Sequence, residues 1–214
     1  MLNEKDKNKK YEKELKVILV GESGTGKTSL INSVQGQVFY EGTQISTLMS
    51  SFIKVELTIN EKKYSVNLWD TIGQEKYRSL TNLFLNDAQI VIFVFDITSK
   101  GSFEQLDYWF DLINKKMGDD VIKGIAANKF DLFEYQDVEE DLIVEYAKKH
   151  GVKYSYTTAT DIKGFNEFLN NLILDYVEKN KDKSDLNGSQ SNKGKTIDNL
   201  TINSINRSTN SKCC

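Results

Sequence analysis

The sequence predicts an α/β fold with a doubly wound, mostly parallel six-stranded sheet and one antiparallel edge strand. Short apolar runs alternate along the chain with segments of helical periodicity, as expected when helices connect parallel strands. Two of the runs, QIVIFVFD at 89–96 and VIKGIAAN at 121–128, are almost continuously apolar, which is typical of strands covered on both faces. Two other runs alternate strictly and follow each other closely, which indicates a hairpin.

The first half of the chain is predicted to begin with a strand at 15–20 (LKVILV), which a glycine-rich turn joins to a helix beginning at Lys27. The hairpin consists of 52–59 (FIKVELTI) and the stretch KKYSVNLW, in which Tyr64 and Leu68 share one face. Because alternation buries only one face of a strand, this pair is predicted at the edge of the sheet.

The second half of the chain supplies the remaining helices and a last short strand near 152–156. The helices are predicted at 102–116, 137–149 and 164–178. His150, the only histidine, precedes Gly151, and this pair is typical of a helix end, with a cation near the last carbonyls and a left-handed glycine cap. We therefore expect no catalytic role for histidine.

Composition excludes several classes of function. The 214 residues are 39% hydrophobic, which suits one domain with a proper core. A net charge of −3 and the lack of a basic stripe argue against nucleic-acid binding. No apolar run approaches the length of a transmembrane helix. The only cysteines, Cys213 and Cys214, are adjacent at the terminus, so we expect no disulfide framework and a reducing, cytosolic setting.

Three regions are predicted along the chain. Residues 1–14 form a charged, flexible N-terminal extension, and 15–178 form the folded domain. Residues 179–214 are dominated by asparagine, serine, threonine and lysine, so they cannot bury enough apolar surface to fold alone. We expect this last region to be a disordered tail.

The glycine-rich turn is predicted to bind phosphates. GESGTGKT, which ends at Thr28, matches G-x-x-x-x-G-K-[ST] and lies between a predicted strand and helix, as this motif requires. Its glycines let backbone N–H groups crowd around phosphate oxygens, and the helix N-terminus favours the same anion. Lys27 is expected to reach the β- and γ-phosphates, and the Thr28 hydroxyl to coordinate Mg²⁺. An ordinary turn with accidental glycines is the disfavoured alternative.

The segment NKFD, after a buried strand, is predicted to select the base. A carboxylate at Asp131 can accept both the N1–H and the N2–H₂ donors of guanine, whereas adenine presents an acceptor there. Asn128 is expected to tie this segment to the phosphate loop, and the stem of Lys129 to cover the base. Asp131 therefore indicates GTP and GDP rather than ATP.

The stretch WDTIGQE, at the end of the hairpin, is predicted to sense the γ-phosphate. Asp70 is placed to hold Mg²⁺ through water, the Gly73 N–H to meet the γ-phosphate, and Gln74 to orient the attacking water. A strand-end cap for Asp70 and a solvated loop position for Gln74 are the alternatives.

With these motifs, the chain resembles the small GTPases of the Ras superfamily, specifically the Rab branch, over about 15–178. WDTIGQEKYRSLT resembles the Rab switch II stretch, and FDITSKGSFEQLDYW resembles a second Rab segment. The terminal Lys-Cys-Cys is similar to the doubly geranylgeranylated end of Rabs. The resemblance therefore implies lipidation of Cys213 and Cys214.

The resemblance implies a P-loop small GTPase fold and a GTP/GDP-cycling switch that regulates vesicle trafficking on membranes. It implies slow, activator-dependent GTP hydrolysis with Mg²⁺ as cofactor. Expected partners are an exchange factor, a GTPase-activating protein, effectors, and escort and dissociation-inhibitor proteins. The expected location is the cytoplasmic face of an endomembrane, with a cytosolic pool. The rival is a GTP-binding module with little hydrolysis that acts as an effector scaffold.

Site roles follow from the resemblance position by position. Phosphate contacts fall on Ser23, Gly24, Thr25, Gly26, Lys27, Thr28 and Ser29. Metal ligands fall on Thr28, Thr47 and Asp70, where Thr47 is the switch I threonine that also meets the γ-phosphate. The last guanine loop falls on Thr158, Ala159 and Thr160.

The chain departs from the family pattern at several positions. Switch I is longer than usual, so Thr43 remains a rival to Thr47. Ile72 replaces a usual alanine and is expected to slow hydrolysis, while Thr160 replaces a usual lysine over the guanine and is expected to weaken base affinity.

An aromatic triad of Phe52, Trp69 and Phe84 is either an effector surface or plain packing between hairpin and helix.

Overall fold

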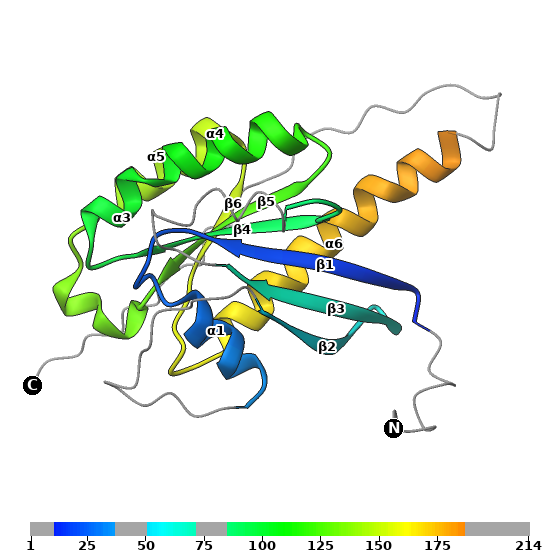
Figure 1. Ribbon diagram of the computed structural model, residues 1–214, viewed down its shortest axis with the longest axis horizontal. Helices are drawn as coiled ribbons and strands as arrows, with labels where there is room; N and C mark the ends of the chain where they lie inside the picture. Colours follow the sequence, from blue (N-terminus) through cyan, green and yellow to red (C-terminus); the bar gives the residue numbers. More distant parts are fainter. Residues whose placement is uncertain (1–10, 37–50, 72–84, 187–214) are drawn as a thin grey trace, which may run out of the picture.

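The computed structural model describes residues 11–36, 51–71 and 85–186 (Figure 1). They contain a six-stranded sheet in the order β2-β3-β1-β4-β5-β6, in which only β2 is antiparallel to its neighbour. The strands are β1 (Lys13–Val20), β2 (Ser51–Ile59), β3 (Lys62–Asp70), β4 (Ile90–Asp96), β5 (Ile122–Asn128) and β6 (Lys153–Tyr156). The predicted fold class is confirmed, including the antiparallel edge strand.

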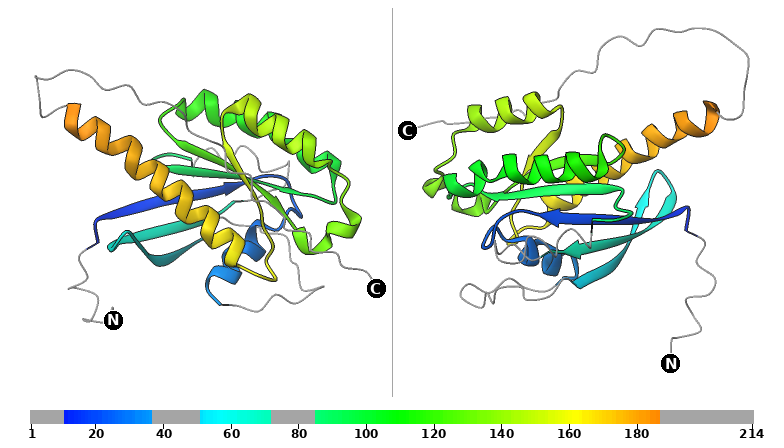
Figure 2. Two further views of the ribbon diagram at one scale, coloured as in Figure 1. Left: turned by 180° about the vertical axis from the view of Figure 1, so that it is seen from behind. Right: turned by 45° about the horizontal axis from the view of Figure 1, so that its top comes forward.

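Helices cover both faces of this sheet. The helical elements are α1 (Lys27–Val34), α3 (Lys100–Glu104), α4 (Leu106–Met117), the short 3₁₀ helix η3 (Phe130–Tyr135), α5 (Glu140–His150) and α6 (Lys163–Leu186). One face carries α1 and α6, and the other carries α3, α4 and α5, as the two views in Figure 2 show. Among the described residues, no helix is both long and apolar enough to cross a membrane.

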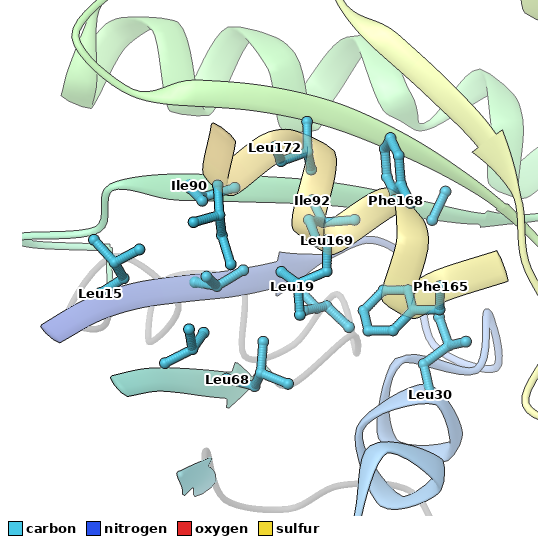
Figure 3. Close-up of a cluster of buried hydrophobic side chains, with 14 of the residues drawn as sticks. Leu15, Leu19, Leu30, Leu68, Ile90, Ile92, Phe165, Phe168, Leu169 and Leu172 are labelled. Atoms are coloured by element: carbon cyan, nitrogen blue, oxygen red, sulfur yellow. The ribbon is translucent and has the colours of Figure 1, made fainter. Parts of the chain in front are cut away.

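Each face of the sheet has its own apolar core, because successive strand residues point to opposite sides. In β1, Leu15, Val17 and Leu19 pack toward α1 and α6, whereas Ile18 and Val20 pack toward α4 and α5. Figure 3 shows the first of these cores, where Phe165 and Leu169 of α6 lie over the strands. All seven residues of β4 are buried, as the continuous apolar run predicted.

The predicted hairpin is confirmed with a two-residue turn. Ile59 pairs with Lys62, and the turn residues Asn60 and Glu61 have φ angles of 49° and 64°. Two consecutive residues with positive φ are typical of a type I′ turn, whose twist matches that of the flanking strands. On β3, Tyr64 and Leu68 are both buried, as expected from the alternation.

Several boundaries differ from the prediction. The helix predicted at 102–116 is divided into α3, which Ser99 caps by accepting a hydrogen bond from the Ser102 N–H, and α4. η3 was not predicted, because its six residues are too short for a periodic signal. α6 continues eight residues beyond 178, because its polar last turns have the composition of a tail but contain good helix formers. The prediction for His150 is confirmed: α5 ends there, with Gly151 as its left-handed cap (φ 63°).

Candidate functional site

The predicted binding motifs follow β1, β3 and β5, which are parallel strands of one sheet. The carboxyl ends of parallel strands share an edge, so the three segments converge. The phosphate loop that follows β1 depends on two crowded glycines. A Cβ at Gly21 would lie 2.1 Å from the Val94 carbonyl oxygen, and one at Gly26 would lie 2.4 Å from Asn128 Nδ2. Only glycine therefore lets this loop lie so close to β4 and β5.

Lys27 is held inside the loop as a buried cation. Its side chain is 5% exposed, and Nζ donates hydrogen bonds to the Gly21 and Glu22 carbonyls at 2.8 and 2.7 Å. Burial lowers the pKa of the Lys27 ammonium to about 8, although the carboxylates of Asp70 and Glu22 oppose this change. The loop thus presents a partly desolvated positive charge, which an anionic ligand would stabilise.

Thr28 and Asp70 place two side-chain oxygen atoms next to each other near this charge. Thr28 Oγ1 donates to Asp70 Oδ2 at 2.7 Å, and Asp70 is buried at the end of β3. The parallel pairing of Leu19 with Asp70 brings the two segments together. A hydroxyl and a carboxylate fit Mg²⁺, which prefers hard oxygen ligands and usually keeps phosphate and water as the others. Among the described residues, no three His, Cys, Asp or Glu side chains cluster as a complete metal site.

Asn128 joins the three loops of the site. Its Nδ2 donates to the Thr25 carbonyl at 2.8 Å, as predicted, and its Oδ1 accepts from Thr157 Oγ1 at 3.1 Å. Asn128 is 1% exposed, so both polar ends of the amide are satisfied inside the protein. The phosphate loop, the end of β5 and the loop after β6 are therefore held as one unit.

The predicted base-selecting residues lie together on the loops after β5 and β6. The Thr158 hydroxyl donates to Asp131 Oδ1 and accepts from the Thr160 N–H at 3.1 Å. Ser33 Oγ of α1 lies 2.7 Å from the Ala159 carbonyl oxygen, which ties this loop to the helix after the phosphate loop. The structure brings Thr158, Ala159 and Thr160 to the same edge as Asp131, although they are far apart in sequence.

Lys129 has a partner that the sequence did not reveal. Its Nζ forms an ion pair with Asp96 Oδ2 at 2.6 Å, and Asp96 is 7% exposed at the end of β4. Asp96 Oδ1 also accepts from the Thr98 N–H at 2.9 Å. This pair anchors the Lys129 side chain to the end of β4. The only feature of the sequence that could have indicated this ion pair is an acidic residue at the end of a buried strand.

A second missed contact supports the phosphate loop from outside. The Trp109 indole N–H, on α4, donates to Glu22 Oε1 at 3.2 Å, and Trp109 is fully buried. Glu22 contributes its carbonyl to Lys27, so the helix, the loop and the buried cation form one chain of contacts. No motif in the sequence pairs these two positions.

Two members of the predicted aromatic triad lie in the described residues. Phe52 stacks on Trp69 with ring centroids 4.8 Å apart and rings inclined by 22°. Lys16 Nζ lies 4.6 Å from the centroid of the Trp69 ring. Phe52 is 52% exposed, so packing against Trp69 covers only part of its surface.

Other predicted residues lie outside the described residues, and their roles stay predictions. They are Thr43, Thr47, Ile72, Gly73, Gln74, Phe84, Cys213 and Cys214.

Comparison with known proteins agrees with the geometry. The profile of the Ras family matches residues 16–178. "Ras-related protein Rab-21" of Geodia cydonium is 36% identical over 165 residues, which cover 77% of this chain and 72% of that protein. The human protein of the same name is 33% identical over 163 residues, covering 76% and 72%. "Ras-related protein Rab-26" of Bos taurus is 34% identical over 149 residues, covering 70% of this chain and 58% of that protein.

Proposed function

Because this chain belongs to the Ras family, as a divergent Rab-like small GTPase, we propose that the edge formed by the loops after β1, β3, β5 and β6 binds GTP and GDP with Mg²⁺. Family membership implies that the protein hydrolyses GTP and acts as a switch in vesicle trafficking, with exchange factors, activating proteins and effectors as regulators and partners. It also implies association with an endomembrane. The scaffold alternative, with little hydrolysis, is not favoured, since the family is one of GTP hydrolases.

The phosphates are proposed to lie in the loop formed by residues 23–29. The buried Lys27 ammonium supports this placement, since phosphate oxygens would replace the Gly21 and Glu22 carbonyls as its acceptors. Thr28, Asp70 and Thr47 would hold Mg²⁺, which neutralises charge on the β- and γ-phosphates when it is bound. Of these three ligands, Thr28 and Asp70 already lie side by side.

Guanine is proposed to bind against Asp131, between Lys129 and the 158–160 loop. The Thr158 hydroxyl, which donates to Asp131, orients the carboxylate that would accept the two guanine donors. The observation that carries the whole assignment is the contact of Asn128 with the Thr25 carbonyl, because it holds the base segment against the phosphate loop.

For hydrolysis, we propose that Gln74 orients the attacking water and that Gly73 and Thr47 contact the γ-phosphate. A partner's arginine would accelerate the slow intrinsic reaction, an effect typically worth ~10³–10⁵ in rate. Release of the γ-phosphate would remove the Thr47 and Gly73 contacts, which is the switching event.

Replacement of Asp131 by asparagine tests the proposed base selection. Asparagine keeps one acceptor but adds a donor, so Asp131→Asn should lose GDP affinity by at least about 100-fold and gain affinity for xanthosine diphosphate, which has a carbonyl at C2. Asp137→Asn, a nearby exposed carboxylate, is the matched control and should change neither. Unchanged GDP affinity in Asp131→Asn, or tighter binding of ATP than of GTP by the wild type, would contradict the proposal.

The membrane anchor is proposed to be a pair of geranylgeranyl groups on Cys213 and Cys214, added with the help of escort proteins and masked in the cytosol by a dissociation inhibitor. One lipid chain binds a membrane only marginally, whereas two anchor it stably. Replacing both cysteines with serine should move the protein from membranes to the cytosol on fractionation. Undiminished membrane association of this double variant would rule the anchor out.

A further inference from the structure

An exposed apolar ridge directly follows the base-selecting carboxylate. Leu132, Phe133 and Tyr135 of η3, which we call the η3 ridge, are 39%, 56% and 72% exposed. They are three of the six large hydrophobic side chains that are exposed among the described residues. Exposed aromatic side chains that cluster on a surface are typical of protein-binding sites.

Both ends of this ridge are anchored to the fold. The Phe130 ring packs on Tyr156 with centroids 4.5 Å apart, and the Phe130 N–H donates to the Thr157 carbonyl at 3.1 Å. On the other side Val138 is 1% exposed, and its N–H donates to the Ile97 carbonyl at 3.2 Å. The ridge is therefore presented to solvent on fixed supports, which lowers the entropy lost when a partner binds.

The stretch of chain that carries the ridge is acidic. Residues 130–147 include seven acidic residues and no lysine, arginine or histidine. All seven are exposed: Asp131, Glu134, Asp137, Glu139, Glu140, Asp141 and Glu145. Basic residues lie at the margins of this stretch: the Lys100 backbone N–H donates to Asp137 Oδ2 at 3.2 Å, and Lys149 and His150 lie against the Tyr146 ring.

A purely structural role accounts for only part of this charge. Glu140 and Asp141 lie in the first turn of α5, where the helix dipole favours carboxylates. That effect does not explain Glu134, which lies between Phe133 and Tyr135 in sequence. It also does not explain why these two aromatic rings are exposed. An acidic rim also disfavours an anionic membrane or a nucleic acid as the occupant, because both would be repelled.

We propose that the η3 ridge is a docking site for a basic, amphipathic segment of a partner protein. Apolar side chains of that segment would cover Phe133 and Tyr135, and its lysines or arginines would face Glu134, Glu139 and the carboxylates of the first turn of α5. Complementary charge would speed the encounter and fix the register, while burial of the aromatic rings would hold the complex together. In Figures 1 and 2 the loop between β5 and α5 lies far from the C-terminal end of α6, at the other end of the molecule.

The test uses the full-length, ¹⁵N-labelled protein and a synthetic 14-residue peptide of lysine and leucine at helical spacing. Titration should shift backbone amide signals of 130–142 before others. The double variant Phe133→Ser/Tyr135→Ser should weaken binding by at least about tenfold, as loss of two central aromatic contacts typically does. Phe52→Ser removes an aromatic side chain elsewhere that is nearly as exposed as Phe133, and it should leave the affinity unchanged.

Two control peptides separate the components of the proposal. A glutamate–leucine peptide keeps the apolar face, and a lysine–serine peptide keeps the charge; each should bind at least about tenfold more weakly than the lysine–leucine peptide. The proposal is overturned if the lysine–leucine peptide does not bind, shifts signals elsewhere, or binds the double variant equally well. It is also overturned if sedimentation shows that the ridge pairs with a second copy of the chain, through a dimer that the double variant loses. The double variant should bind GDP as tightly as the wild type. This control would show that its loss of peptide binding does not result from a loss of nucleotide binding.

Discussion

At the scale of single residues, Lys27 is the group whose environment has the clearest measurable consequence. Burial lowers its pKa in the folded protein to about 8 from the ordinary value of 10.5. Between these two pH values the unfolded chain holds a proton that the folded chain has released, so stability should rise with pH across this window. We predict that the free energy of unfolding increases there by up to about 1.4 kcal/mol per pH unit.

Urea unfolding of ligand-stripped protein at pH 7.5 to 10 measures this pH dependence of the free energy of unfolding. The variant Lys27→Met is the reference. The variant lacks the titrating group, so the difference between the two proteins isolates it. Parallel pH profiles for both proteins would refute the prediction. Bound phosphates favour the ammonium form, so GDP affinity of the wild type should also fall as pH rises above 8.

The residues of the site were predictable to different degrees. Lys27, Thr28, Asp70 and Asn128 carry their chemistry in short motifs whose spacing is itself the signal, and the structure brings them together. Asp96 pairs with Lys129, 33 positions away in sequence, and Trp109 pairs with Glu22, 87 positions away. Both contacts arise only through tertiary packing. No local pattern encodes such pairs, so sequence reasoning missed both.

At the scale of elements, strands were easier to predict than helix boundaries. Alternation in β2 and β3 and continuous burial in β4 are direct consequences of strand geometry, so they are visible in the sequence. The break between α3 and α4 falls inside one helical pattern, and the extension of α6 to Leu186 falls in a segment with the polar composition of a tail. η3 has no buried residue, and it therefore leaves no hydrophobic pattern to read.

The β2–β3 turn gives a prediction at this scale. Glu61 has a φ of 64°, a left-handed conformation that a residue with a Cβ adopts at a cost. Glu61→Gly would create Asn-Gly, the preferred type I′ pair, and should raise the free energy of unfolding by about 0.5–1 kcal/mol. Thermal or urea unfolding measures the change. Glu61→Ala removes the same side chain but keeps the Cβ, and equal stabilisation by alanine would show that backbone strain is not the cause.

At the scale of the whole molecule, the site unites segments that the chain keeps far apart. The phosphate loop belongs to the start of the domain, the base segment to its middle and the loop after β6 to its end. Asn128 of the base segment bonds to Thr25 of the first and to Thr157 of the last. A nucleotide that contacts all three would therefore brace the sheet from β1 to β6. The two apolar cores pack the same strands from opposite faces, so this bracing should be transmitted to the entire domain.

We therefore predict one cooperative, nucleotide-dependent unfolding transition. GDP with Mg²⁺ at about 1,000 times its dissociation constant should stabilise the folded state by about 4 kcal/mol, because ligand binds only that state. ATP at the same concentration should have little effect, since Asp131 would face the acceptor at N1 of adenine. Calorimetry of ligand-stripped protein with each nucleotide measures the shift. Asn128→Ala should lose much of it, because the base segment and the phosphate loop would then no longer be held in one arrangement. Equal shifts with GDP and ATP, or none with either, would contradict the proposed site itself rather than one of its residues.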